Sequence, residues 1–264
     1  MNLKTLKNLK ATVKSYRNSE HFLLKMLYRI TKRPYKILWA IYRFIVSANY
    51  RSIIYLKFFR SKEIHQTTTL TSFNRYPEIF FSCKKYFNNQ NNLKLLSYGC
   101  STGEEVASLR LYFPDSDIIG TDINEDCLKQ ARKIGLDNRQ RIIQSTNRNI
   151  SKHGPYDAIF CMAVLQREPH RIHDQGIKNI KKIYPFDKFD SQLIKLDKSI
   201  KRGGLIVFCS TQYQFQDSSI APRYDAYGEI KQNQMTPIFD KNGDIIEEDT
   251  PLLSIYKKIR NSSS

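Results

Sequence analysis

The chain has 264 residues, of which 41% are hydrophobic, so it can bury the core of one α/β domain and carry an additional segment. Its formal net charge is +18, and residues 1–65 contribute most of it, with 15 Lys or Arg against 2 Asp or Glu. The five cysteines include no C-x-x-C pair, which argues against a zinc motif or a disulfide framework and is typical of a reduced cytoplasm.

The basic segment, residues 1–65, is predicted to be helical. Residues 1–18 place leucines and lysines on two neighbouring stripes of one helix. A second helical run is expected from Tyr35, just after Pro34, to Phe59, and is interpreted as a helix covering the core. We expect no signal peptide and no transmembrane helix, because lysines alternate with apolar residues at the start and basic residues interrupt the most apolar stretch.

Two roles remain open for the basic N-terminal helix. It can dock the protein on an anionic membrane surface or an acidic partner, which would place a cytoplasmic protein at the inner face of a membrane. It can equally pack on the body of the protein with its lysines in water.

From Pro77 onward the pattern predicts a helix and then an alternation of strands and helices. Pro77 suits the first turn of a helix that runs to about Phe87. The alternation predicts a mostly parallel sheet with helices on both faces, and the tail predicts an antiparallel edge. The fold class is therefore α/β and Rossmann-like, with an N-terminal segment at 1–65 and a second domain at 66–264. Strands are expected near 94–98, 117–122, 141–145, 156–161 and 204–210, helices near 103–113, 125–134 and 187–201 (the last ending at Lys201 to Gly204), and the antiparallel addition over 236–240 and 252–258.

The most informative motif is a turn of small residues between a predicted strand and a predicted helix, followed by a lone acid. The turn contains Gly99, Ser101 and Gly103, which let the backbone approach a ligand at a helix N-terminus. Asp122 follows Gly103 by 19 positions, where the next parallel strand would end and a carboxylate can accept both hydroxyls of a ribose. A turn that only serves packing is the simpler interpretation, but the strand, helix and acid around it favour ligand binding. Asn124 is better placed than Asp122 to cap the next helix.

In this order, the motifs resemble those of class I S-adenosylmethionine-dependent methyltransferases, and the CheR-type enzymes most of all. The resemblance extends over residues 66–210. It implies S-adenosylmethionine as the cofactor and methyl transfer as the activity. The matching pieces are Thr71 to Arg75 (T-S-F-N-R), Gly99 to Glu105 (G-C-S-T-G-E-E), Arg148 to Ile150, Pro155 to Cys161 (P-Y-D-A-I-F-C) with Val164-Leu165, and Leu196 to Phe208.

The resemblance also implies roles for individual residues. Glu105 and the turn backbone would hold the methionine end with its ammonium, and Arg75 would pair with its carboxylate, near Thr71. Asp122 would hold the ribose. The complete set of expected cofactor residues is Thr71, Arg75, Gly99, Cys100, Ser101, Thr102, Gly103, Glu105, Asp122, Ile123, Asn149 and Ile150 beside the adenine, and Met162 and Ala163 near the sulfonium.

The acceptor is not indicated by the resemblance, because this chain departs from the CheR pattern. Asn74 replaces a Phe, and Met162-Ala163 replaces an Arg-Asn pair. We therefore expect methyl transfer to an unidentified small molecule, glycan or protein carboxylate, with Gln166, Arg167 and His170 as candidate acceptor residues after the fourth strand. No catalytic base is identified and no metal is expected, since His170 and His173 have no third ligand at a useful spacing. Cys161 is interpreted as a small buried strand residue.

Two other functions stay open. A nucleic-acid methyltransferase would explain the basic segment, although Cys161 to Val164 lacks the D/N-P-P-Y/F pattern of amino-methylating enzymes. A protein that binds cofactor or a membrane without turnover would explain the missing Arg-Asn pair.

Overall fold

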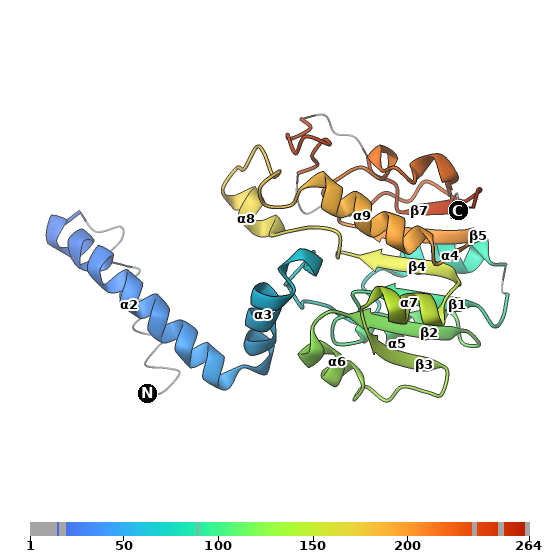
Figure 1. Cartoon of the computed structure of the whole chain (residues 1–264), viewed down its shortest axis with the longest axis horizontal. Coiled ribbons are helices and arrows are strands. Elements are labelled where there is room, and N and C mark those ends of the chain that lie inside the picture. Colours follow the sequence, from blue (N-terminus) through green and yellow to red (C-terminus); the bar gives the residue numbers. More distant parts are fainter. Residues whose placement is uncertain (1–14, 16–19, 89, 234–236, 248–250, 262–264) are drawn as a thin grey trace. The chain divides into compact units, whose positions relative to one another are not determined.

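The computed structural model describes residues 15, 20–88, 90–233, 237–247 and 251–261 (Figure 1). The helix expected over residues 1–18 therefore lies outside the described residues, apart from Ser15. The chain divides into two compact units, residues 1–55 and residues 56–264.

The N-terminal helices differ from the expected ones in where they begin and break. Helix α2 spans Phe22–Val46 and contains Pro34, so the prediction that a helix begins after this proline was wrong. The apolar period of α2 continues on both sides of Pro34, and this continuity outweighs the local cost of an interior proline. The break falls at Ser47, whose backbone is extended and whose hydroxyl accepts the Tyr50 N–H at the start of α3 (Ala48–Phe59). None of the helices in the described part of the chain is long and apolar enough to cross a bilayer.

The second unit is built on one seven-stranded sheet in the order β3-β2-β1-β4-β5-β7-β6 (Figure 1). Strands β1 to β5 pair in parallel, whereas β7 runs antiparallel to both β5 and β6. This confirms the predicted Rossmann-like sheet with an antiparallel C-terminal edge. The strands are β1 (Lys94–Tyr98), β2 (Asp117–Asp122), β3 (Gln140–Gln144), β4 (Tyr156–Met162), β5 (Ile200–Cys209), β6 (Tyr224–Ala226) and β7 (Ile255–Lys258).

Successive residues of the central strands alternate between two apolar cores. In β4, Ile159 and Cys161 belong to one core, while Ala158 and Phe160 belong to the other. Because side chains alternate across a strand, each face of the sheet needs its own cover of helices. The helices are α4 (Pro77–Tyr86), α5 (Glu104–Tyr112), α6 (Glu125–Ala131), α7 (Asn147–His153), α8 (Pro169–Asp174) and α9 (Phe186–Asp197), with short 3-10 turns η2 (Ser61–Glu63), η3 (Phe215–Asp217) and η4 (Ala221–Arg223).

Two details of the C-terminal half correct the expectations. Lys201 to Gly204 do not end a helix: α9 ends at Asp197, and these residues form the first part of β5, where Ile200 already pairs with Tyr156. Glycine is required there because a Cβ on Gly204 would lie 2.8 Å from the Asp157 carbonyl oxygen. The expected antiparallel pairing forms over 255–258, whereas Phe239 makes only isolated bridges.

A buried ion-pair cluster joins the antiparallel edge to the rest of the sheet. The Lys258 ammonium lies 2.9 Å from the Asp197 carboxylate at the end of α9, and Arg223 lies 3.2 Å from the same group. The Tyr224 hydroxyl donates to Asp197 over 2.8 Å. Asp197 and Lys258 are 1% and 3% exposed, so the Asp197–Lys258 pair is shielded from bulk water, and the cluster holds α9, η4, β6 and β7 together.

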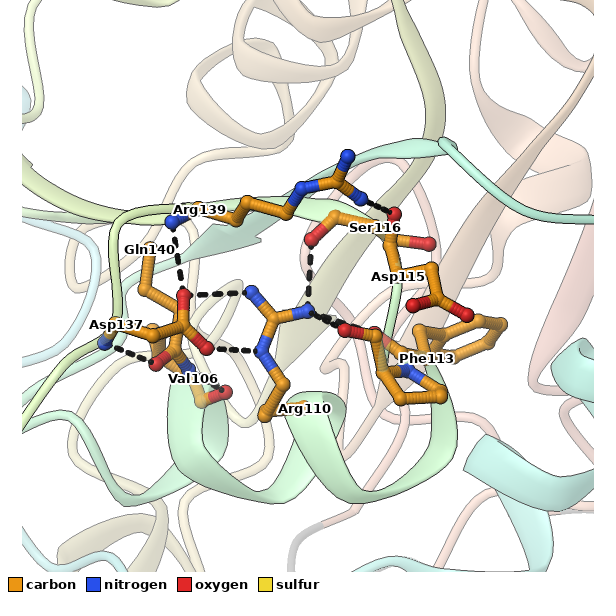
Figure 2. A network of polar contacts seen from close by, with 9 residues as sticks. Val106, Arg110, Phe113, Asp115, Ser116, Asp137, Arg139 and Gln140 are labelled. Carbon is orange, nitrogen blue, oxygen red and sulfur yellow. Dashed lines mark hydrogen bonds and ion pairs between the residues drawn. The ribbon is translucent and has the colours of Figure 1, made fainter.

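A second polar network stabilises the opposite edge of the sheet (Figure 2). The Arg110 guanidinium lies 2.7 Å from Asp137 and donates to the carbonyl oxygens of Phe113, Pro114 and Ser116. Arg110 thus supplies partners for backbone carbonyls beyond the C-terminus of α5. The network lies where β2 and β3 begin. It therefore stabilises the amino ends of these strands, away from the carboxyl ends of the parallel strands.

Candidate functional site

The carboxyl ends of the parallel strands carry a concentration of unusual backbone conformations. Ser101 follows β1 with φ 50°, Ala163 follows β4 with φ 58°, and Ser210 follows β5 with φ 54°. Positive φ is costly for residues with a Cβ and is concentrated at ligand-binding sites. The carboxyl edge of the sheet is therefore the candidate site, as expected for an open α/β sheet.

The turn after β1 requires glycine at both predicted positions. Gly99 has φ +81°, and a Cβ there would lie 2.4 Å from the Val164 side chain. Gly103 has φ +99°, and a Cβ there would lie 2.4 Å from the Ile134 side chain. The turn is therefore pressed between the loop after β4 and the end of α6, and α5 starts from it at Glu104.

Asp122 lies at the end of β2 and faces this turn. One carboxylate oxygen accepts the Ser101 N–H over 2.9 Å, and the other accepts the Asn124 N–H over 2.7 Å. Burial raises the pKa of Asp122, while the backbone N–H donors of Asn124, Ser101 and Ile123 act against that rise. Asn124 accepts the Asp126 N–H and caps α6, which leaves Asp122 without a capping role. A carboxylate offers about four lone-pair sites, so these backbone donors leave Asp122 room to accept a hydroxyl.

Glu105 lies in the first turn of α5 and accepts the Ser97 hydroxyl over 2.7 Å. Burial raises the pKa of Glu105 to about 8, although Ser97 and Arg75 both act to lower it. A carboxylate of this kind suits a cationic ligand group, because a neighbouring cation offsets the cost of its burial. Ser97 was not predicted as a site residue. The sequence signal was a single serine within an apolar strand, and the structure buries that serine fully.

The segment before α4 is tied to the turn and to α5. The Ser101 hydroxyl donates to the Thr69 carbonyl over 3.1 Å, and the Asn74 N–H donates to Ser108 over 2.7 Å. Arg75 is exposed, lies over the Tyr76 ring and influences Glu105 electrostatically. The segment thus brings a guanidinium into the electrostatic range of the Glu105 carboxylate.

The remaining expected cofactor residues occupy different environments. The Asn149 side chain donates to the Gln144 carbonyl at the end of β3, whereas Ile150 is 4% exposed and packs in the core. Met162 is 6% exposed and also packs in the core, with Ala163 directly after it. Cys100 is buried in the turn, and Ile123 contributes a backbone N–H to Asp122. Thr71 is partly buried, and the Thr102 hydroxyl donates to Glu104. The roles of these residues stay predictions.

The loop after β4 holds the three expected acceptor residues in two different ways. Gln166 is 5% exposed and donates to the Ala163 carbonyl over 3.1 Å. Gln212, after β5, accepts the Arg167 N–H and donates to the Arg167 carbonyl. His170 is exposed on α8. Gln212 was missed because its bonds reach a residue 45 positions away, a contact that has no local signature.

Cys161 fits its interpretation as a small buried strand residue. Cys161 is fully buried, and burial raises the pKa of its thiol well above the ordinary value. No group of three or more His, Cys, Asp or Glu side chains able to hold a metal occurs among the described residues.

The sheet order, the glycine-rich turn and the acid at the end of β2 define a class I, Rossmann-like methyltransferase domain. Residues 89–243, more than half of the chain, match the family described as a methyltransferase domain, and the chain belongs to this family. No curated protein matches the chain.

Several solved structures are similar to this chain at low sequence identity. The plantazolicin methyltransferase BpumL in complex with SAH is 14% identical, with a TM-score of 0.39 over 78% of this chain and 62% of BpumL. DesVI from Streptomyces venezuelae is 16% identical, with a TM-score of 0.37 over 53% of this chain and 50% of DesVI. PKMT2 from Rickettsia typhi is 18% identical, with a TM-score of 0.38 over 53% of this chain and 26% of PKMT2.

Proposed function

We propose that this chain transfers a methyl group from S-adenosylmethionine to an acceptor at the carboxyl edge of the sheet. The pair of carboxylates on either side of the glycine-rich turn carries this proposal. Asp122 offers free lone pairs to a diol, and Glu105 offers a half-buried carboxylate to an ammonium. These chemistries suit the ribose and the methionine end of the cofactor.

S-adenosylmethionine supplies a methyl group that is already activated on a sulfonium. The residues of this chain then have to hold the donor, align the acceptor and exclude water, and such alignment can reach effective molarities of ~10^5 M or more. Ala163 and Gln166 border the carboxyl end of β4, where an acceptor would approach. A general base is required only if the acceptor carries a proton at attack, and we assign no residue to that role.

Calorimetric titration of S-adenosylmethionine into the purified protein, beside an Asp122→Ala variant, tests this function. We expect micromolar binding to the wild type and a loss of about ten-fold or more in the variant, because charged hydrogen bonds are removed. Asp126→Ala, at the exposed start of α6, is the matched control and should bind normally. Folded wild-type protein that binds no cofactor would overturn the proposal. Donor-dependent methylation in a cell extract then separates turnover from binding alone.

We also propose that α2 docks this protein on an anionic membrane surface at the cytoplasmic side. The helix exposes an apolar stripe whose members recur three, four or seven residues apart. The charge of the region also supports docking on an anionic surface, because residues 22–59 contain 8 Lys or Arg and no Asp or Glu. An apolar stripe with cations on the remaining surface is typical of helices that lie in the membrane interface. The exposed residues of the stripe are Leu23, Met26, Ile30, Ile37, Leu38, Ile41, Phe44 and Ile45.

Co-sedimentation with vesicles tests the docking. Wild-type protein should bind phosphatidylserine-containing vesicles more tightly than pure phosphatidylcholine vesicles, and added salt should weaken that binding. The double variant Ile37→Asp/Ile41→Asp should lose it, whereas Leu111→Asp, at an exposed apolar residue of α5, should not. Equal binding of the wild type and the double variant would contradict the proposal, and so would self-association of the wild type through α2 without vesicle binding.

A further inference from the structure

Arg167 and Lys188 are two cations near the carboxyl edge of the sheet that form no ion pair within the part of the chain that the structure describes. Arg167 follows β4, and Lys188 lies in the first turn of α9. Among residues 20–88, 90–233, 237–247 and 251–261, no carboxylate lies within ion-pair distance of either side chain. Nη1 of Arg167 is buried and has no hydrogen-bond partner in that part of the chain. Arg167 as a whole is half-buried, but a buried guanidinium nitrogen without a partner is costly, and an oxyanion would satisfy it.

The two cations lie close enough to act on each other. Burial and, to a smaller extent, the Arg167 charge together lower the pKa of Lys188 to about 8. The Lys188 ammonium donates to the Ser61 carbonyl over 3.2 Å, which leaves two of its three donors for another group. An anion between Arg167 and Lys188 would relieve their mutual repulsion.

Buried polar side chains fix the Arg167 backbone and add no further charge. The Gln212 side chain, fully buried, makes two hydrogen bonds to the Arg167 backbone, at 2.7 and 3.0 Å. His65 Nδ1 lies 2.7 Å from the Tyr184 hydroxyl, and both residues are buried. Burial lowers the pKa of His65 to about 3, so this imidazole is neutral and adds no third charge.

Gln166, the residue before Arg167, carries a buried polar group that can accept a hydrogen bond. Oε1 of Gln166 is buried and has no partner among the described residues, although Nε2 of the same side chain donates to the Ala163 carbonyl. Gln166 is therefore bonded to Ala163, which follows β4 at the proposed methyl-transfer position. Its Oε1 atom is left to accept a hydrogen bond. An N–H or O–H group of a bound molecule would satisfy it.

We propose that Arg167 and Lys188 bind an oxyanion group, a carboxylate or a phosphate, of the methyl acceptor, and that Gln166 Oε1 accepts a hydrogen bond from the same molecule. This assignment rests on the proposed methyltransferase function, because it places the anion beside the reacting edge of the sheet. It specifies the acceptor class as anionic and assigns Arg167 and Lys188 as residues that determine specificity.

Anion binding without cofactor tests the assignment independently of turnover. Inorganic phosphate and acetate would each be titrated into wild-type protein, followed by calorimetry and by the shift in Tm, at constant ionic strength. We expect one or both anions to bind, and Arg167→Gln and Lys188→Gln each to weaken that binding about ten-fold or more. A preference for phosphate or for acetate identifies the oxyanion that the acceptor carries.

Matched controls separate this site from general attraction to a basic protein. Arg171→Gln, whose guanidinium pairs with Glu168, and Lys182→Gln, at an exposed lysine, should leave anion binding unchanged. S-adenosylmethionine binding to Arg167→Gln should stay at the wild-type level, which shows that the variant folds and that the cofactor site is intact. The assignment is overturned if the wild type binds neither anion, or if Arg167→Gln and Lys188→Gln bind them as tightly as the wild type. If the wild type binds no S-adenosylmethionine, the proposed function is overturned instead.

Discussion

The carboxylate of Asp122 accepts the backbone N–H of Ser101 over 2.9 Å, across 21 positions of the chain. This bond joins the end of β2 to the turn after β1, so Asp122 shapes the turn before any ligand binds. Ser101 has φ 50°, a conformation that the bond from Asp122 helps to hold.

Asp122→Asn should therefore destabilise the protein without ligand. Both oxygens of Asp122 face backbone N–H donors, and an amide NH2 would place donor against donor on one side. We expect a loss of about 1–3 kcal/mol in the free energy of unfolding, measured by urea denaturation. Asp126→Asn, whose carboxylate pairs only with the exposed Gln130, should change it by less than about 0.5 kcal/mol. Equal stability of the two variants would show that Asp122 does not hold the turn.

Gly103→Ala should cost more stability than the same change at Gly135. Both glycines have positive φ, so each substitution carries a backbone cost of about 1–2 kcal/mol. A Cβ on Gly103 would also lie 2.4 Å from the Ile134 side chain and 3.1 Å from the Ala131 Cα, whereas one on Gly135 would meet nothing within 4 Å. This crowding adds about 1–3 kcal/mol. Thermal unfolding of both variants checks the difference, and Gly103→Ala alone should also weaken cofactor binding.

Glu105 should make stability and cofactor binding depend on pH in opposite directions. Burial raises its pKa from 4.5 to about 8, so the folded state holds this proton more tightly than the unfolded state. Stability without ligand therefore falls as the pH rises from about 4.5 to about 8, and Glu105→Gln should lack this component. A bound ammonium favours the ionised carboxylate, so cofactor affinity should rise over the same range.

Calorimetry at pH 7 in buffers of different ionisation enthalpy measures the proton that Glu105 releases on binding. Wild type should release up to one proton more than Glu105→Gln. If both release the same number, Glu105 does not face the ammonium. Ser97→Ala keeps the carboxylate but removes a hydrogen bond that lowers the pKa, and it should shift the pH dependence to higher pH.

Lys258→Met should destabilise the antiparallel edge of the sheet. The Lys258 ammonium contacts the Asp197 carboxylate, which is 1% exposed, and its removal leaves that charge with Arg223 as the remaining cation. We expect a loss of about 3 kcal/mol in the free energy of unfolding. Adding Asp197→Asn to Lys258→Met should recover part of this loss, because the buried charge is removed. Lys257→Met, on the exposed side of β7, should have little effect.

Local sequence was enough to predict the parallel strands and the glycine-rich turn. Strands β1 to β5 coincide with short apolar runs, and the turn is marked by small residues between two such runs, so neighbouring residues carry the signal. The same local reasoning failed at Pro34 and at Lys201. A helix was expected to begin just after Pro34, and another was expected to end at Lys201. In each case packing along a longer element outweighed the local preference.

The amino-acid sequence by itself therefore determined the fold class, the turn and the acid at the end of β2. The tertiary structure decided that Ser97 bonds Glu105, that Gln212 holds Arg167, and that Arg167 and Lys188 lie near each other with no ion-pair partner among the described residues. These contacts join side chains from separate strands and helices, and whether a buried charge has a partner depends on which side chains the fold brings within a few ångströms. Apolar periodicity specifies which face of an element is buried, but it does not specify which polar groups meet at the sheet edge.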